Sequence, residues 1–144
     1  MDEVKDYVGF FNRLFAFIID IFIIIFIGTM ITYSILGLLS IFTTIDPNSF
    51  EAIASTMIIY PLIFWLYYAI SESSPWMSTF GKKLLGIKVV DYSLNRVSFS
   101  KATVRFLAKF LSILLLWIGF IMIAFTKKKQ GLHDIISECY VVKK

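Results

Sequence analysis

Residues Arg13 to Leu39 read RLFAFIIDIFIIIFIGTMITYSILGLL, and this apolar stretch decides the fold. A helix of about 20 apolar residues is long enough to cross a lipid bilayer. One carboxylate, Asp20, interrupts the stretch, and an ionised aspartate at the centre of a bilayer costs about 2.5–3.5 kcal/mol. Arg13 precedes Asp20 by about two helical turns, so the two side chains project from roughly the same face. We therefore expect Asp20 to face a protein interior or a wet cavity, near Arg13.

The composition is that of an integral membrane protein. Of the 144 residues 58% are hydrophobic, against roughly 45–50% in soluble domains, and the mean hydropathy is +0.81. This leaves room for one membrane domain over residues 1–144 and for no separate soluble domain. Acidic residues near the N-terminus and the length of the apolar run favour a retained anchor over a cleaved signal peptide. Cys139 is the only cysteine, which excludes an intramolecular disulfide.

The distribution of basic residues predicts the topology. Of the 14 Lys and Arg residues, twelve follow residue 81 and none lies between Leu14 and Gly81. Loops rich in Lys and Arg remain on the cytoplasmic side of a membrane. A second apolar helix is expected over residues 52–70, and the basic excess begins after it. We therefore expect a multi-pass protein of the cell membrane, with a cytoplasmic N-terminus and with residues 40–51 on the opposite side.

Residues 84–100 follow the second helix and carry a strand pattern. β-branched and alternating residues flank a turn-prone segment from Asp91 to Asn95, which predicts a small cytoplasmic β-hairpin. Ser100 is then a candidate N-cap for the next helix.

Residues 101–126 begin as an amphipathic helix and continue as an apolar run. Lys101, Arg105 and Lys109 form one basic stripe, as is typical of a helix lying in the membrane interface. The apolar run either spans the membrane, which would place residues 127–129 outside, or turns near residues 117–119 and returns. We favour the re-entrant form, which keeps the tail, residues 127–144, cytoplasmic and lets residues 140–142 pair with the strand at residues 87–90.

The expected fold is therefore an all-α integral membrane protein. It has two transmembrane helices, over residues 13–39 and 52–70, a re-entrant or third spanning helical segment, and the small cytoplasmic β-hairpin. Anionic headgroups of membrane lipids are the expected partners of its basic residues. The candidate lipid-binding side chains are Lys101, Arg105, Lys109, Lys127, Lys128 and Lys129.

Several function classes lack their sequence signals. The segment around Gly81 and Lys82 does not have the spacing of a Walker A loop. His133 has no second His or Cys at ligand spacing, so no metal site is expected. No serine is placed beside a candidate base for nucleophilic catalysis. We expect a protein that is not an enzyme, has no cofactor and binds no nucleic acid.

Two further motifs carry a family resemblance. Residues 79–90 read TFGKKLLGIKVV, and residues 130–134 read QGLHD. Together with Arg13 and Asp20 these motifs resemble the RDD family of small membrane domains, which is named after one arginine and two aspartates. The likeness extends from about Gly9 to Val142. By position, Arg13 matches the arginine, Asp20 the first aspartate and Asp134 the second. The resemblance implies a part in transport, and some members are described as cation/proton antiporters.

Two functions fit these residues. In the first, which we favour, Asp20 exchanges a proton for a monovalent cation, and Arg13 and Asp134 complete the ion site. Two spanning helices and a hairpin can hardly enclose a transport path, so a homo-oligomer is expected. In the second, the chain is a non-transporting membrane adaptor or assembly factor. Its three charged residues then lock the fold, and its basic cytoplasmic face binds lipid or a partner.

Overall fold

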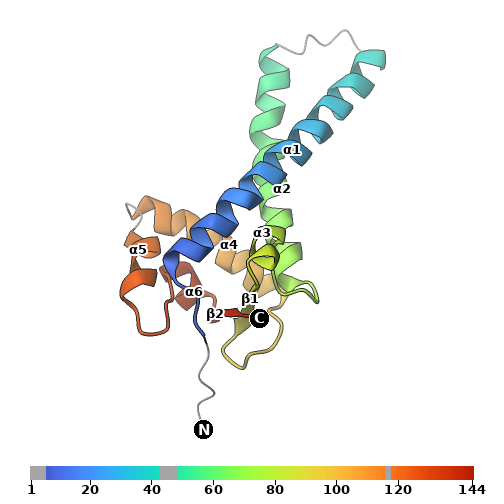
Figure 1. Ribbon diagram of the computed structural model, residues 1–144. Coiled ribbons are helices and arrows are strands. Elements are labelled where there is room, and N and C mark those ends of the chain that lie inside the picture. The colour runs from blue at the N-terminus through green and yellow to red at the C-terminus, as the bar shows by residue number, and fades with distance from the viewer. Residues whose placement is uncertain (1–5, 43–48, 116–117) are drawn as a thin grey trace.

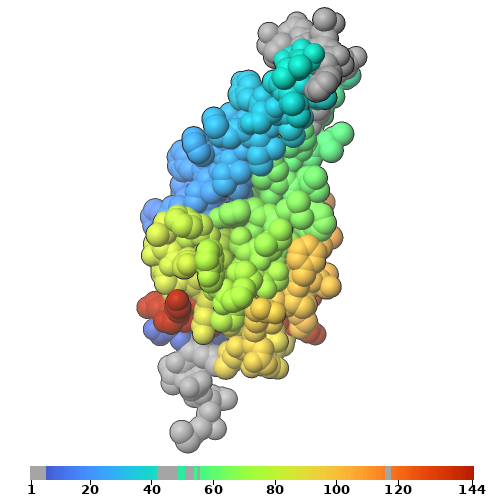
Figure 2. All heavy atoms as spheres, turned by 90° about the vertical axis from the view of Figure 1, so that its right-hand side faces the viewer, coloured from blue at the N-terminus to red at the C-terminus, as the bar shows by residue number. Residues whose placement is uncertain are grey.

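The structure is a computed structural model that describes residues 6–42, 49–115 and 118–144. Two long helices, α1 (Phe10–Phe42) and α2 (Phe50–Ser73), form a helical hairpin. The hairpin projects from a smaller body that the later elements build around its base (Figure 1). Residue 6 and the C-terminus both lie at the end with this body. In Figure 2 the two helices likewise continue beyond the rest of the molecule.

Helix α1 confirms the apolar span predicted over residues 13–39, although it begins earlier and ends later. Within the described residues it is the one helix long and apolar enough to cross a membrane by itself, and only 22% of its most apolar window is buried. Large side chains such as Phe22 and Phe26 are exposed, with relative exposures of 70% and 67%. A helix that is apolar on all faces and uncovered by protein fits a lipid environment.

Helix α2 contains the second helix expected over residues 52–70 and is longer at both ends. Its 24 residues include Pro61. At 1.5 Å per residue the helix is about 36 Å long, which exceeds the hydrocarbon thickness of a bilayer. Half of the connection expected over residues 40–51, namely residues 43–48, lies outside the described residues.

Six short elements form the body. They are α3 (Phe80–Leu84), β1 (Ile87–Asp91), α4 (Phe99–Leu114), α5 (Ile118–Phe125), α6 (Leu132–Ile136) and β2 (Cys139–Lys143). Strands β1 and β2 pair antiparallel with Val89 opposite Val141. The pairing of residues 87–90 with residues 140–142, expected for the re-entrant form, is confirmed.

The hairpin predicted over residues 84–100 is wrong in its second half. Residues 97–100 do not form a strand beside β1, because the chain enters α4 at Phe99. The N-cap is Ser98 and not Ser100, since the Ser98 side chain accepts a hydrogen bond from the Lys101 amide. A serine hydroxyl that satisfies a free amide of the first turn favours helix over strand at this point.

Helix α5 lies at 102° to α4, so the apolar run after residue 110 is not one straight helix. Such a bend occurs in a broken span as well as in a re-entrant segment, so the re-entrant form stays a prediction. The predicted turn at residues 117–119 falls partly outside the described residues. Helix α5 has eight residues, which is far fewer than a span requires.

The apolar core of the body joins the sheet to the base of the hairpin. Val89, Val97, Cys139 and Val141 are fully or almost fully buried and cluster with Val8, which precedes α1. The core therefore fixes the position of the first turn of α1 against the two-stranded sheet.

Candidate functional site

Five buried charged side chains form a continuous series of ion pairs at the base of the hairpin. Each comes from a different helix, and none has a relative exposure above 9%. In order of contact they are Arg13 of α1, Asp134 of α6, Arg105 of α4, Glu72 of α2 and Lys82 of α3. Because each member holds its neighbours, the series ties five helices together.

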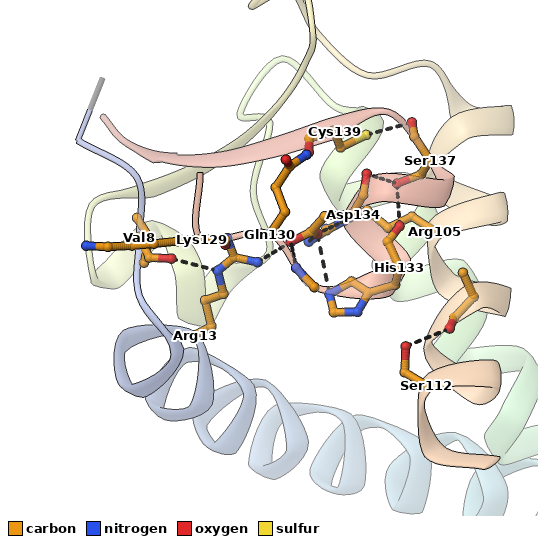
Figure 3. A network of polar contacts seen from close by, with 12 residues as sticks. Val8, Arg13, Arg105, Ser112, Lys129, Gln130, His133, Asp134, Ser137 and Cys139 are labelled. Carbon is orange, nitrogen blue, oxygen red and sulfur yellow. Dashed lines mark hydrogen bonds and ion pairs between the residues drawn. The ribbon is translucent and has the colours of Figure 1, made fainter. Parts of the chain in front are cut away.

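Asp134 lies at the centre of this network (Figure 3). Its Oδ1 accepts hydrogen bonds from Nε and Nη2 of Arg105 at 2.9 and 2.7 Å. Its Oδ2 accepts from Arg13 Nη1 and, at 3.1 Å, from the Gly131 amide. The Nε2 atom of His133 lies 3.4 Å from Oδ1. Asp134 thus caps α6, as a residue at the third position of a helix can, and also neutralises two guanidinium groups.

Arg13 connects the start of α1 to two other segments. Its Nε donates to the Val8 carbonyl oxygen at 3.0 Å, and its Nη2 donates to the Lys129 carbonyl oxygen. A guanidinium has five N–H donors in a planar fork, which suits it to such a junction. The residue therefore joins α1 to the loop before α6 through Asp134 and the backbone.

Glu72 occupies the other end of the network. Its Oε2 accepts a hydrogen bond from Arg105 Nη1 at 2.7 Å, and its Oε1 accepts from Lys82 Nζ. Each oxygen of the Glu72 carboxylate thus binds one cationic side chain. The negative charge of Glu72 offsets part of the cost of burying Arg105 and Lys82.

Electrostatics in the body follow from this pairing. Burial alone would raise the pKa of the Asp134 carboxyl, but the guanidinium groups of Arg105 and Arg13 hold that pKa well below its ordinary value. Burial lowers the pKa of the Lys82 ammonium, and Glu72 opposes this effect. Burial also lowers the pKa of His133 to about 3, so its imidazole is neutral at physiological pH.

Asp20 is also fully buried, but it lies in a separate polar cluster. It accepts hydrogen bonds from Tyr67 Oη at 2.7 Å, from Thr79 Oγ1 at 2.6 Å and from the Gly81 amide at 2.7 Å. Arg13 and Asp20 line the same cavity, but the expected pairing of the two is wrong. Both residues are described, and the structure has no ion pair between them, because the start of α3 occupies the position beside Asp20.

The close packing of α3 on α1 explains the glycine in the TFGK motif. A Cβ atom on Gly81 would lie 2.2 Å from the Ala16 carbonyl oxygen and 2.9 Å from Asp20 Oδ1. Only a residue without a side chain lets α3 approach α1 closely enough for the Gly81 amide to bind Asp20. Thr79 is the N-cap of α3 and binds the same carboxylate.

The site of Arg13, Asp20 and Asp134 can now be compared with known proteins. A family model described as the RDD family matches residues 7–138 of the chain, which include all three residues. The chain belongs to the RDD family. This RDD-family protein is similar to two Bacillus subtilis (strain 168) proteins.

The first relative carries the name uncharacterized protein YxaI. It is 47% identical over 93 residues, which cover 65% of this chain and 61% of YxaI. The chain thus spans about three fifths of the length of that relative. The second, named uncharacterized membrane protein YteJ, is 29% identical over 142 residues, which cover 94% of this chain and 80% of YteJ. No solved structure matches the chain.

In this RDD-family membrane protein, the basic stripe of α4 does not point outward as expected. Arg105 is buried between two carboxylates, so its assignment as a lipid-binding residue is wrong. Lys109 places its Nζ atom 3.9 Å from the centre of the Tyr68 ring. Lys101 is partly exposed and pairs with Glu138. The stripe faces inward because α2 and α6 each present one carboxylate to it.

The three consecutive lysines at residues 127–129 are exposed, so lipid binding by these side chains stays a prediction. Sequence reasoning missed Glu72 and Lys82 as members of the charge network. Glu72 had a signal, since it is a lone carboxylate in the last turn of an apolar helix and such a residue requires a partner. Lys82 had one too, because it lies in the motif that carried the family resemblance.

Proposed function

We propose that this chain is a non-transporting membrane adaptor or assembly factor, and not an enzyme. The observation that carries the proposal is that both oxygens of each buried carboxylate among the described residues accept a hydrogen bond. Glu72 and Asp134 are each held by two cationic side chains, and Asp20 is held by three donors. Carboxylates bound in this way stabilise one arrangement of helices, whereas an exchange site must release its ligands in each cycle.

In the proposed arrangement α1 and α2 both cross the cell membrane, and the body lies at the cytoplasmic side. All twelve Lys and Arg residues after residue 81 belong to the body or its loops, as the positive-inside rule requires for that side. The outer face of α4 is apolar, with Leu107 58% and Val104 44% exposed. This face would lie against lipid, while α4 and α5 enter the membrane without crossing it.

The exposed lysines at residues 127–129 supply the proposed contact with anionic headgroups. Each Lys close to an anionic membrane surface contributes on the order of 1 kcal/mol of attraction. Lys101, at the rim of the body, adds to the same surface. The body would thereby dock on the inner leaflet or present its basic face to an acidic partner.

The second candidate function is cation/proton antiport by a homo-oligomer. One observation favours it: Asp20 is a buried carboxylate within the apolar span and lines a cavity between the helices. A carrier would use Asp20 as the exchanging group, and a second copy of the chain would complete the path for protons and monovalent cations.

Ion flux into proteoliposomes separates the two functions. The purified chain is reconstituted with a pH-sensitive dye inside, and inward gradients of sodium, lithium or potassium are applied. The adaptor proposal expects no proton flux above that of protein-free liposomes. Flux that is present in the wild type, lost in Asp20→Asn and retained in the matched exposed variant Glu138→Gln would overturn it and support antiport. Retained burial of Cys139 in each variant controls for folding.

A further inference from the structure

A cavity of about 490 Å³ lies between α1, α2, α4 and α5. Its volume is within the range of about 300–1,000 Å³ that is usual for small-molecule sites. The walls are mainly aromatic and aliphatic. They include Phe17, Phe64, Phe106, Phe110, Ile113 and Ile123. Walls of this kind suit a hydrocarbon chain.

Charged side chains also line part of the cavity, although nearly all of the wall is apolar. They are Arg13, Lys82, Arg105, Lys109 and Asp20. The first three cations are paired with Glu72 or Asp134, and neutral donors occupy Asp20. Lys109 forms no ion pair with a described carboxylate, and burial lowers the pKa of its ammonium to about 7, an effect that Glu72 opposes. Its ammonium lies over the Tyr68 ring, which leaves hydrogens free to bind an anion.

Two buried polar atoms of the cavity wall point to a ligand independently of this charge. No described residue forms a hydrogen bond with Tyr68 Oη or with His133 Nδ1, although both side chains are only 3% exposed. A buried polar group without a partner costs about 1–3 kcal/mol, so such groups are rare unless something binds them. Tyr68 Oη is a donor beside Lys109, and neutral His133 can accept from a hydroxyl group.

We propose that the cavity binds a membrane lipid with a net negative phosphate headgroup. The phosphate accepts hydrogen bonds from Lys109 Nζ and Tyr68 Oη, and an acyl chain occupies the aromatic part of the cavity. This site is internal and separate from the exposed lysines at residues 127–129. It does not depend on which of the two functions proposed above holds.

The test measures thermal unfolding of the purified full chain in neutral detergent, detected by the reaction of Cys139 with a thiol-reactive dye. Dioctanoyl phosphatidylglycerol is titrated as the probe, with dioctanoyl phosphatidylcholine and inorganic phosphate as comparison ligands. We expect a saturable rise in the unfolding temperature with phosphatidylglycerol alone. An equal response to phosphatidylcholine, a response to inorganic phosphate, or no response would overturn the proposal.

Two variants locate the binding. Lys109→Gln should weaken the apparent affinity for phosphatidylglycerol at least about tenfold, as the loss of a charged hydrogen bond implies. The matched surface variant Lys143→Gln, at a side chain that is 59% exposed, should leave it within about twofold. The reverse ranking would place binding at the surface lysines and overturn the proposal.

Tyr68→Phe provides a second variant if Lys109→Gln does not fold. Because Tyr68 Oη has no partner in the structure, this variant should be at least as stable as the wild type without lipid and yet bind more weakly. Unchanged affinity in Tyr68→Phe would overturn the proposal.

Discussion

The substitution Gly81→Ala tests whether the packing of α3 on α1 fixes the Asp20 cluster. The added Cβ atom would lie 2.2 Å from the Ala16 carbonyl oxygen, whereas ordinary contacts are at about 3.5 Å or more. Helix α3 must therefore retreat by about 1 Å. Such a shift stretches the 2.7 Å hydrogen bond from the Gly81 amide to Asp20 towards the limit of hydrogen bonding.

The expected loss of stability follows from these two effects. Overpacking of a buried contact costs about 1–3 kcal/mol. A hydrogen bond to a charged acceptor contributes about 1.5–3 kcal/mol. We expect Gly81→Ala to lower the free energy of unfolding by about 3–5 kcal/mol, which corresponds to a fall in unfolding temperature on the order of 10 °C. Alanine has a higher helix propensity than glycine, so propensity alone would predict that Gly81→Ala stabilises the protein. We expect the opposite.

The buried Cys139 provides the assay, because it is the only thiol in the sequence and has 0% relative exposure. Its reaction with a thiol-reactive dye during heating in detergent reports unfolding. Gly37→Ala is the matched control, since a Cβ atom there would meet nothing within 4 Å. It should unfold at or slightly above the wild-type temperature. If Gly81→Ala unfolds within about 2 °C of Gly37→Ala, α3 does not pack on α1 as described.

Three further predictions concern the body. Asp134→Asn leaves Arg13 without a described carboxylate partner and Arg105 with Glu72 alone, and it should cost about 3–5 kcal/mol, whereas Glu138→Gln at an exposed ion pair should cost less than about 1 kcal/mol. Equal losses in the thermal assay would contradict a buried network. Because the pKa of His133 is lowered to about 3, the unfolded chain binds more protons below its ordinary pKa near 6.5. The free energy of unfolding should therefore decrease as the pH is lowered below about 6.5, by about 2 kcal/mol at pH 5. NMR of the folded chain at pH 5 should find the His133 imidazole neutral. A cysteine at exposed Lys127, in a Cys139→Ala chain, should react with an impermeant maleimide only after cells are opened. Labelling of intact cells would place this end outside.

The sequence was sufficient to predict elements that depend on local composition. The apolar run around Asp20 predicts α1, since no other structure satisfies its backbone hydrogen bonds in lipid. The β-branched residues of β1 and β2 predict strands. Their pairing was expected only for the re-entrant form, because the basic clusters then lie on one side. The partners of Arg13 were not predictable, since helical spacing gives the face of a side chain but not the distant element that packs against it.

The orientation of α4 was misjudged for a different physical reason. The amphipathic pattern was interpreted as a helix in the membrane interface, with Lys101, Arg105 and Lys109 facing lipid headgroups. That interpretation assumed that the apolar face packs on the protein, but lipid is as apolar as a protein core and can cover this face instead. Glu72 of α2 and Asp134 of α6 then decide the orientation, and Arg105 is buried while Leu107 is exposed.

The charge balance of the cavity distinguishes the functions more sharply than the presence of Asp20 does. A cation that binds Asp20 must displace donors from Tyr67, Thr79 and the Gly81 amide, each of which contributes on the order of 1 kcal/mol or more. It must also approach a cavity wall with a net positive charge, since two carboxylates pair with three of its four cationic side chains. An anion meets neither cost, because Lys109 forms no ion pair with a described carboxylate and a bound phosphate would raise its pKa, which burial lowers to about 7. The same geometry that disfavours cation exchange at Asp20 therefore favours a negatively charged lipid beside it.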